Sequence, residues 1–522
     1  MKKQPPAATV QGMASGLRRY LYFTAAVTGA AIMIVEILGA KMLAPYVGTS
    51  HFVWTAQIAV TLMALAAGYF VGGWLVDRSP RLTRLYGAIL VAAAYLCVTV
   101  LAVGPVAYWC LQFKLALGSL LASAFLFFVP LSLLAMVGPF FIRVLTSSVS
   151  SVGGNVGRLT ALSTLGSFVG TLLIGYVLIP FLPNSWTMYL TAGLLFGVVA
   201  VYFLVWEKKS RDRPAVAAGV LAGLFIGFIG VRKDSRSIFS NSTEIFRGNS
   251  NFGQLQVVDA GSGARRYYLN DYLVQNIYDP AEQQSTTLFT YMLHDLARAY
   301  APRIESALCI GLGVGVVPTR LGSEGIRVDV VEINPAVVPL GERYFGSQPN
   351  RFNLFIGDGR HFVNATTNRY DVIVLDAFLG DSSPSHLMTR ESFDAMRRIM
   401  NPGGVLVINC FADFNSGTDF FGASLDKTLK HVFPGVRIHA AGNGNVFFVA
   451  SNREELRILR SPDFNRVHAS CRDQARAAFA GIVEANPRSG IVLTDDYNPV
   501  EFYDAANRER IRRHLAMAVR SF

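Results

Sequence analysis

Seven long apolar runs occupy residues 20–231 and constrain the fold of this chain more than any other feature. They cover residues 20–44, 52–76, 84–108, 117–142, 157–181, 186–206 and 214–231. A helix needs roughly 20 apolar residues to cross a bilayer, and the last run is the shortest. We therefore expect residues 20–234 to form a transmembrane domain of about seven helices, preceded by a polar, basic N-terminus at residues 1–19.

Composition separates this region from the rest of the chain. Only 16% of the 522 residues are charged, whereas soluble proteins carry about 25%, and residues 235–522 have an ordinary globular composition. The net charge is +12, and in the apolar half the cations lie between the runs, which is typical of topology signals and not of nucleic-acid binding. The five cysteines include no CxxC pair, so the sequence indicates neither zinc nor a disulfide framework.

Polar and small residues inside the apolar runs carry two further expectations. Two small-xxx-small pairs predict close packing between helices. They are Gly68 with Gly72 and Gly166 with Gly170. Glu36 lies inside the first run, where a carboxyl group is costly and therefore a functional candidate. The alternative is that packing neutralises Glu36 or that it pairs with Lys41, and the sequence leaves both open.

The remainder of the chain predicts an α/β fold in two parts. Residues 235–284 alternate apolar and polar positions between Gly-rich turns, which indicates a small antiparallel β-sheet. Over residues 285–522, helical segments alternate with the strands ALCIGL, RVDVVEI, FNLFIGD, YDVIVLDAF and GVLVINC. This order predicts a doubly wound, Rossmann-like sheet with mostly parallel strands, and ligands bind such sheets at the carboxyl ends of the strands.

Three glycines at alternate positions follow the first of these strands: Gly311, Gly313 and Gly315. The dinucleotide fingerprint needs a small residue where Val316 stands, so the spacing favours a nucleoside without a pyrophosphate. Glu332 ends the next strand, 17 residues after Gly315. We expect its carboxylate to accept hydrogen bonds from a ribose diol, the alternative being a solvated strand-end acid.

Two later acids lie at the ends of further strands. Asp358, followed by Gly359, can accept a hydrogen bond from an adenine amino group, although Asp-Gly is also ordinary turn sequence. Asp376 follows the strand YDVIVL, and Asp381 lies in the loop beyond it. An amine with a pKa near about 10 must lose a proton to become a nucleophile. We predict that Asp376 serves that amine; the alternative is a helix cap or loop acid.

These residues resemble the spermidine synthases, the aminopropyltransferase branch of the SAM-methyltransferase fold. The resemblance covers residues 252–409. DYLVQ at 271–275 is similar to the family's DGxxQ motif, Gly311–Gly315 to its glycine loop, and YDVIVLD at 370–376 to its catalytic strand. The whole chain, with its apolar half and LTDDYNPVE at 493–501, resembles the membrane-fused spermidine synthase-like proteins of bacteria.

The resemblance implies transfer of an aminopropyl group from decarboxylated SAM, or use of SAM itself, with a small amine such as putrescine as acceptor. Asp376 then acts in catalysis and Asp381 in substrate binding. The residues assigned to the nucleoside are Gln275, Gly311, Gly313, Gly315, Glu332, Asp358 and Gly359. The expected partners are the amine and the lipid bilayer, with a homodimer as a candidate assembly and with neither metal nor nucleic acid.

Two departures from the family pattern keep alternatives open. Val314 stands where spermidine synthases carry the acid for the donor's amine, and the segment Ser285–Tyr291 lacks the acids of their DExxYHE helix. One alternative is a SAM-dependent methyltransferase that acts on a membrane-associated acceptor. The other is a polyamine or metabolite carrier with a nucleoside-sensing domain.

The resemblance also bears on the side of the membrane. The N-terminus and the loops at 77–84 and 207–213 hold most of the cations of the apolar half. The positive-inside rule places them in the cytoplasm of a bacterial inner (cell) membrane, and seven spans would then put the C-terminal domain outside. A SAM-type co-substrate is a cytoplasmic metabolite, so we expect that domain in the cytoplasm despite the loop charges.

Overall fold

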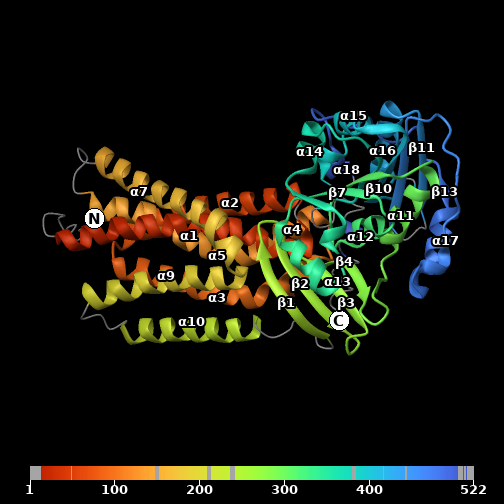
Figure 1. The fold of residues 1–522 in the computed structure, drawn as a ribbon. Coiled ribbons are helices and arrows are strands. Elements are labelled where there is room, and N and C mark those ends of the chain that lie inside the picture. The colour runs from red at the N-terminus through yellow and green to blue at the C-terminus, as the bar shows by residue number, and fades with distance from the viewer. Residues whose placement is uncertain are drawn as a thin grey trace. The chain divides into compact units, whose positions relative to one another are not determined.

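A computed structural model describes residues 13–48, 50–146, 152–207, 213–234, 242–378, 384–415, 417–440, 444–503, 509–510 and 513. The chain divides into two compact units, residues 1–238 and 239–522. The first unit is helical, and the second contains all of the described β-strands (Figure 1). Each unit is considered by itself below.

The helical unit contains the apolar helices that hydropathy predicts. Single helices form α1 (Ser15–Val47), α2 (His51–Arg78), α3 (Leu82–Cys110), α9 (Asn184–Val205) and α10 (Arg213–Asp234). The fourth segment joins α4 (Leu115–Ser123), α5 (Val129–Ala135) and α6 (Val137–Leu145), and the fifth joins α7 (Val152–Leu173) to α8 (Ile179–Phe181). Among the described residues, seven segments are long and apolar enough to cross a membrane, each overlapping one predicted run.

The four glycines of the small-xxx-small pairs lie at close helix contacts. On α2, Gly68 and Gly72 lie against the main chain of the fourth segment, and on α7, Gly166 and Gly170 lie against the main chain of α1. At each position a Cβ atom would collide with the neighbouring backbone. The expected role in helix packing is therefore confirmed.

The interior of the helical unit contains polar groups without partners. Glu36 on α1 is half-buried, and within the described residues it forms no ion pair with Lys41. Gln57 on α2 is fully buried beside Gly39 of α1, and neither atom of its side-chain amide has a hydrogen-bond partner. Since α1 is a continuous helix, Glu36 lies about one turn from Gly39. Two polar side chains, Glu36 and Gln57, therefore lie close to each other in the C-terminal half of α1 and the adjoining part of α2, within an otherwise apolar core.

The second unit begins with the small antiparallel sheet that the alternating pattern predicts. Its strands are β1 (Ser242–Ser250), β2 (Gly253–Ala260), β3 (Arg265–Asn270), β4 (Leu273–Asp279) and β5 (Gln284–Ser285), paired in chain order. Asp271 and Tyr272 turn the chain between β3 and β4 with positive φ of 46° and 61°. Tyr268 and Tyr278 pack edge-on against Phe345 of the following domain, which holds the small sheet in place.

An eight-stranded sheet forms the centre of the α/β domain. Its strands are β6 (Ser306–Ile310), β7 (Arg327–Glu332), β8 (Asn353–Ile356), β9 (Tyr370–Leu375), β10 (Met400–Phe411), β11 (Gly435–Ala440), β12 (Asn445–Ser451) and β13 (Ile482–Val483). The order is β13-β11-β12-β10-β9-β6-β7-β8. The strands from β8 to β10 are parallel, as predicted, whereas β12 runs antiparallel between β10 and β11.

Helices cover both faces of this sheet (Figure 1). They are α11 (Leu288–Tyr300), α12 (Val316–Ser323), α13 (Val338–Phe345), α14 (Gly359–Ala365), α15 (Arg390–Arg398), α16 (Phe420–Val432), α17 (Arg472–Ala480) and α18 (Val500–Tyr503). Alternate residues of β6 enter different apolar clusters, Ala307 and Cys309 on the α11 face and Leu308 and Ile310 on the α15 face. The predicted doubly wound fold is confirmed.

The topology fixes where a ligand can bind. The chain runs from β6 outward through β7 to β8, and then returns to the other side of β6 to form β9 and β10. A crevice forms outside the carboxyl ends of the strands at such a switch point. Gly311 follows β6 and Asp376 follows β9, so the two lie on either side of this point.

Candidate active site

The glycine loop and the end of β9 are in direct contact. Gly311 has φ +99°, and a Cβ atom there would collide with the main-chain oxygen of Asp376. The Gly311 N–H donates to Val331 at 2.9 Å, and the Asp376 N–H donates to Ile310 at 3.0 Å. Glycine is therefore required at 311 both by its conformation and by the neighbouring main chain.

Gly313 differs from its two neighbours in the loop because nothing lies within 4 Å of where its Cβ would stand. Gly315, with φ +81°, precedes α12 and packs against the Ser347 side chain. The loop is thus held at Gly311 and Gly315 and open at Gly313. The open position is where a ligand can approach the main chain.

This contrast predicts different results for two alanine variants. Gly311→Ala should lower the melting temperature sharply, because the methyl group collides with backbone. Gly313→Ala should lower the free energy of unfolding by only about 1–2 kcal/mol, because alanine is strained at the left-handed φ. It should nevertheless weaken nucleoside binding because its methyl group fills the open position. Thermal unfolding and calorimetric titration with methylthioadenosine measure both effects. Undiminished nucleoside binding by Gly313→Ala would remove the open position from the ligand site.

Glu332 fastens the end of β7 to the glycine loop. One carboxylate oxygen accepts a hydrogen bond from the Leu312 N–H at 2.9 Å, and the other accepts from the Asn334 N–H at 2.7 Å. Burial raises the pKa of Glu332, although these backbone bonds oppose the shift. The Ile333 N–H is a third backbone donor, and since a carboxylate has about four acceptor sites, Glu332 can hold the loop and still accept one hydrogen bond from a diol. The ribose role stays a prediction.

Asp358 caps the start of helix α14, a role that the sequence did not predict for it. One of its oxygens accepts from the His361 N–H at 2.9 Å at the start of α14, and the other lies 3.0 Å from His386 Nε2. Burial alone would raise the pKa of Asp358, but the His361 N–H and His386 hold it below its usual value. Gly359 packs against Ile310 of β6. These contacts leave the expected adenine role a prediction.

Asp376 is the acid whose surroundings most favour proton transfer. Its carboxylate accepts a hydrogen bond from Asn409 Nδ2 at 2.9 Å, and the Asn409 side-chain oxygen accepts from Asn445 at 3.0 Å. Burial raises the pKa of Asp376 to about 6, against the lowering effect of the Asn409 bond. A carboxylate with a pKa close to the operating pH is suited to general base catalysis. The sequence reasoning did not identify Asn409 or Asn445.

The remaining candidates have different outcomes. Gln275 is the extra residue at a β-bulge, because Tyr268 pairs with Asn276 while the next residue, Leu269, pairs with Val274. Bulges change the direction of a side chain and are common next to active sites. Asp381 lies outside the described residues, so its assignment is not tested.

The segment at 493–501 contributes an acid, Asp495, that forms an ion pair near the start of α14. The sequence did not predict this contact. Asp495 accepts from Thr389 Oγ1 at 2.6 Å and from Arg360 at 2.9 Å. Arg360 also donates to the His386 carbonyl oxygen at 3.2 Å. Asp495 therefore fixes Arg360 one residue beyond Gly359. In the sequence, this segment was noticed only because LTDDYNPVE resembles the membrane-fused spermidine synthase-like proteins, and no role was assigned to any of its residues.

One of the two departures from the family pattern, Val314, is visible in the fold. The Val314 side chain is only 1% exposed and belongs to the apolar cluster beneath α11. An acid with that orientation would be buried, so this loop offers no carboxylate to a donor amine at 314. In α11, His294 is buried between Asp295 and Glu324, each 2.8 Å away. That histidine is therefore structural.

Comparison with known proteins identifies one domain. Residues 287–441 match the family model described as "Spermine/spermidine synthase domain". The polyamine aminopropyltransferase of Vibrio vulnificus is 38% identical over 137 residues, which are 25% of this chain and 46% of that protein. The N-terminal histidine N-methyltransferase of Emericella nidulans is 34% identical over 151 residues, which are 28% of this chain and 26% of that protein.

The shared region is limited to part of each relative. The chain spans about a quarter to a half of the length of the first curated relatives it matches. Among solved structures, spermidine synthase from Thermotoga maritima is 18% identical, with a TM-score of 0.37, covering 45% of this chain and 84% of that one. The family match covers residues 287–441, which are part of the α/β domain.

Proposed function

We propose that the domain containing residues 287–441 transfers an aminopropyl group from decarboxylated SAM to a small amine. The observation that carries this proposal is the contact between Gly311 and Asp376. Because of this contact, the uncovered main chain at Gly313 and the carboxylate of Asp376, whose pKa is raised, both lie at the switch point between β6 and β9. The family match and the aminopropyltransferase relatives support the same reaction.

In this reaction the acceptor nitrogen attacks the propyl carbon bonded to the sulfonium. The new N–C bond takes the nitrogen lone pair, the C–S bond breaks, and its electrons neutralise sulfur to give methylthioadenosine. The nitrogen must be unprotonated when it attacks, so a proton passes to Asp376. Holding the two reactants together supplies most of the rate enhancement, since proximity and orientation alone can lower a barrier by about 7–11 kcal/mol.

Methyl transfer is the second candidate. It is favoured by the apolar surroundings of Val314, which leave the loop without an acid for the donor's amine, and by the match to a histidine N-methyltransferase. The same Asp376 would accept a proton from the methyl acceptor. SAM in place of its decarboxylated form would then be the natural donor.

Product analysis separates the two reactions. Purified protein is incubated with decarboxylated SAM or SAM, and with putrescine, spermidine or membrane extract as acceptor. We expect methylthioadenosine to form with decarboxylated SAM and an amine. S-adenosylhomocysteine as the sole nucleoside product would overturn aminopropyl transfer in favour of methyl transfer.

We propose in addition that the helical unit crosses a bacterial inner membrane seven times. The length and hydropathy of its helices support this. With the α/β domain in the cytoplasm, Arg78, Arg81 and Arg84 at the facing ends of α2 and α3 would lie on the outer side, against the positive-inside rule. We place the α/β domain in the cytoplasm, where its co-substrate is made. Protease treatment of sealed inverted vesicles should cleave that domain, whereas protection there and cleavage in right-side-out vesicles would place it outside.

A further inference from the structure

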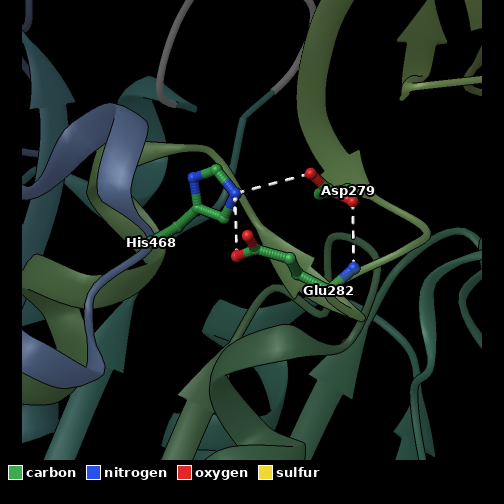
Figure 2. Close-up of side chains that lie close together, drawn as sticks. All are labelled: Asp279, Glu282 and His468. Carbon is green, nitrogen blue, oxygen red and sulfur yellow. Dashed lines mark hydrogen bonds and ion pairs between the residues drawn. The ribbon is translucent and has the colours of Figure 1, made fainter.

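Three side chains that could serve as metal ligands meet away from the nucleoside site. Asp279 ends β4, Glu282 lies in the turn before β5, and His468 precedes α17 (Figure 2). One ligand atom from each lies within 4.8 Å of the other two. The cluster therefore joins the small antiparallel sheet to a segment that is more than 180 residues later in the chain.

The two distances from His468 in this cluster are close to those between two ligands of one ion. His468 Nε2 lies 3.5 Å from an Asp279 oxygen and 3.2 Å from a Glu282 oxygen. A charge-assisted hydrogen bond would be about 2.7–2.9 Å long. Two ligands at about 2.0–2.2 Å from a tetrahedral zinc ion stand about 3.3–3.5 Å apart. The His468 side chain is only 10% exposed, yet its Nε2 forms no hydrogen bond of normal geometry.

Neighbouring groups orient two of the ligands. One Asp279 oxygen accepts from the N–H groups of Ala281 and Glu282 at 2.8 and 3.0 Å, which leaves the other oxygen facing His468. Glu282 is 57% exposed and can adjust its position.

The second nitrogen of the imidazole also has a partner. His468 Nδ1 lies 2.8 Å from Ser470 Oγ and 3.1 Å from the Ser470 N–H. Without a metal, Nδ1 accepts from that N–H and Nε2 carries the proton. When Nε2 binds a metal, its proton is displaced to Nδ1, and the Ser470 N–H that now points at Nδ1 must turn away so that Nδ1–H can donate to Ser470 Oγ, the kind of outer hydrogen bond that metal-binding histidines make.

We propose that Asp279, Glu282 and His468 bind a divalent transition-metal ion, with zinc as the preferred ion and water as the fourth ligand. One nitrogen and two carboxylate oxygens are a ligand set that zinc accepts. The ion fastens β4, the strand that carries Gln275, to the segment before α17. The sequence expectation of no metal rested on the missing CxxC pairs, a test that cannot detect ligands so far apart in the chain.

The test uses the full chain in detergent, freed of any affinity tag and stripped of metal with a chelator. After addition of zinc chloride and desalting, elemental analysis should find one zinc per chain, and zinc should raise the melting temperature. Cobalt(II) in place of zinc should give the strong visible absorption of a tetrahedral site. None of these readouts depends on transferase activity, so the result is independent of the proposed reaction.

Two variants and one matched control complete the test. Asp279→Asn keeps an oxygen for the Ala281 and Glu282 N–H groups but is a poor metal ligand, and His468→Ala removes the nitrogen. Each should weaken zinc binding at least about tenfold. His431→Ala, at an exposed histidine in the last turn of α16, should bind zinc as the wild type does. Equal zinc binding by wild type and Asp279→Asn, or no zinc above background in the wild type, would overturn the proposal.

Discussion

Asp376→Asn should lower the turnover number about 10²–10⁴-fold, the usual contribution of a general base, while nucleoside binding is retained. The asparagine oxygen can still accept the hydrogen bond from Asn409, so the geometry of the site is kept. The melting temperature should stay the same or rise. Because the pKa of Asp376 is raised in the folded state, its ionised carboxylate destabilises the fold above about pH 6.

A matched control lies on the same strand. Asp371 lies near the start of β9, at the opposite end from Asp376. Its carboxylate accepts hydrogen bonds from the Glu305 and Ser306 N–H groups at 2.8 and 3.0 Å. Asp371→Asn should lower the melting temperature and leave turnover within a few-fold of wild type, the reverse of the Asp376 result. Normal turnover in Asp376→Asn would remove the catalytic assignment and favour a nucleoside-sensing domain.

The apolar helices and the central strands could be predicted because each produces a long or repeated hydropathy signal. The run at 157–181 and the strand YDVIVL need no distant partner to be recognised. The convergence of Gly311, Glu332 and Asp376 at one edge followed from parallel topology alone. The antiparallel strands β11 to β13 were not predicted. Among the described elements, β12 directly follows β11 and pairs with it antiparallel, which breaks the alternation of strand and helix.

Side-chain partners from distant segments were beyond sequence reasoning. Asn409 lies in the apolar sequence of a buried strand. Nothing in that sequence indicated that its side chain donates to Asp376, 33 residues away. Glu332 could be placed near a ribose, but its bond to the Leu312 N–H depends on the loop conformation. Likewise, Gln275 lies at a bulge because the pairing of β3 with β4 shifts by one residue, and the hydropathy pattern does not indicate such a shift in register.

The pH dependence of turnover should report the ionisation of Asp376. The carboxylate must be unprotonated to accept the proton from the amine, so turnover should fall below about pH 6, by about tenfold for each pH unit. At pH 4 the rate would then be about one hundredth of its plateau. The ratio kcat/KM, measured from pH 4 to 9, reports the pKa of Asp376 in the protein without bound substrate.

Asn409→Leu distinguishes this ionisation from that of the amine substrate. The hydrogen bond from Asn409 lowers the pKa of Asp376. Its loss should therefore move the acid limb of the pH profile, the fall in rate at low pH, to higher pH, whereas the pKa of the amine is unchanged. Asn401→Leu is the matched control, because Asn401 donates to Asp371 at 2.8 Å between the same two strands, β9 and β10. Its acid limb should stay near pH 6. If the limb is the same in all three proteins, it belongs to the substrate and Asp376 is not the base.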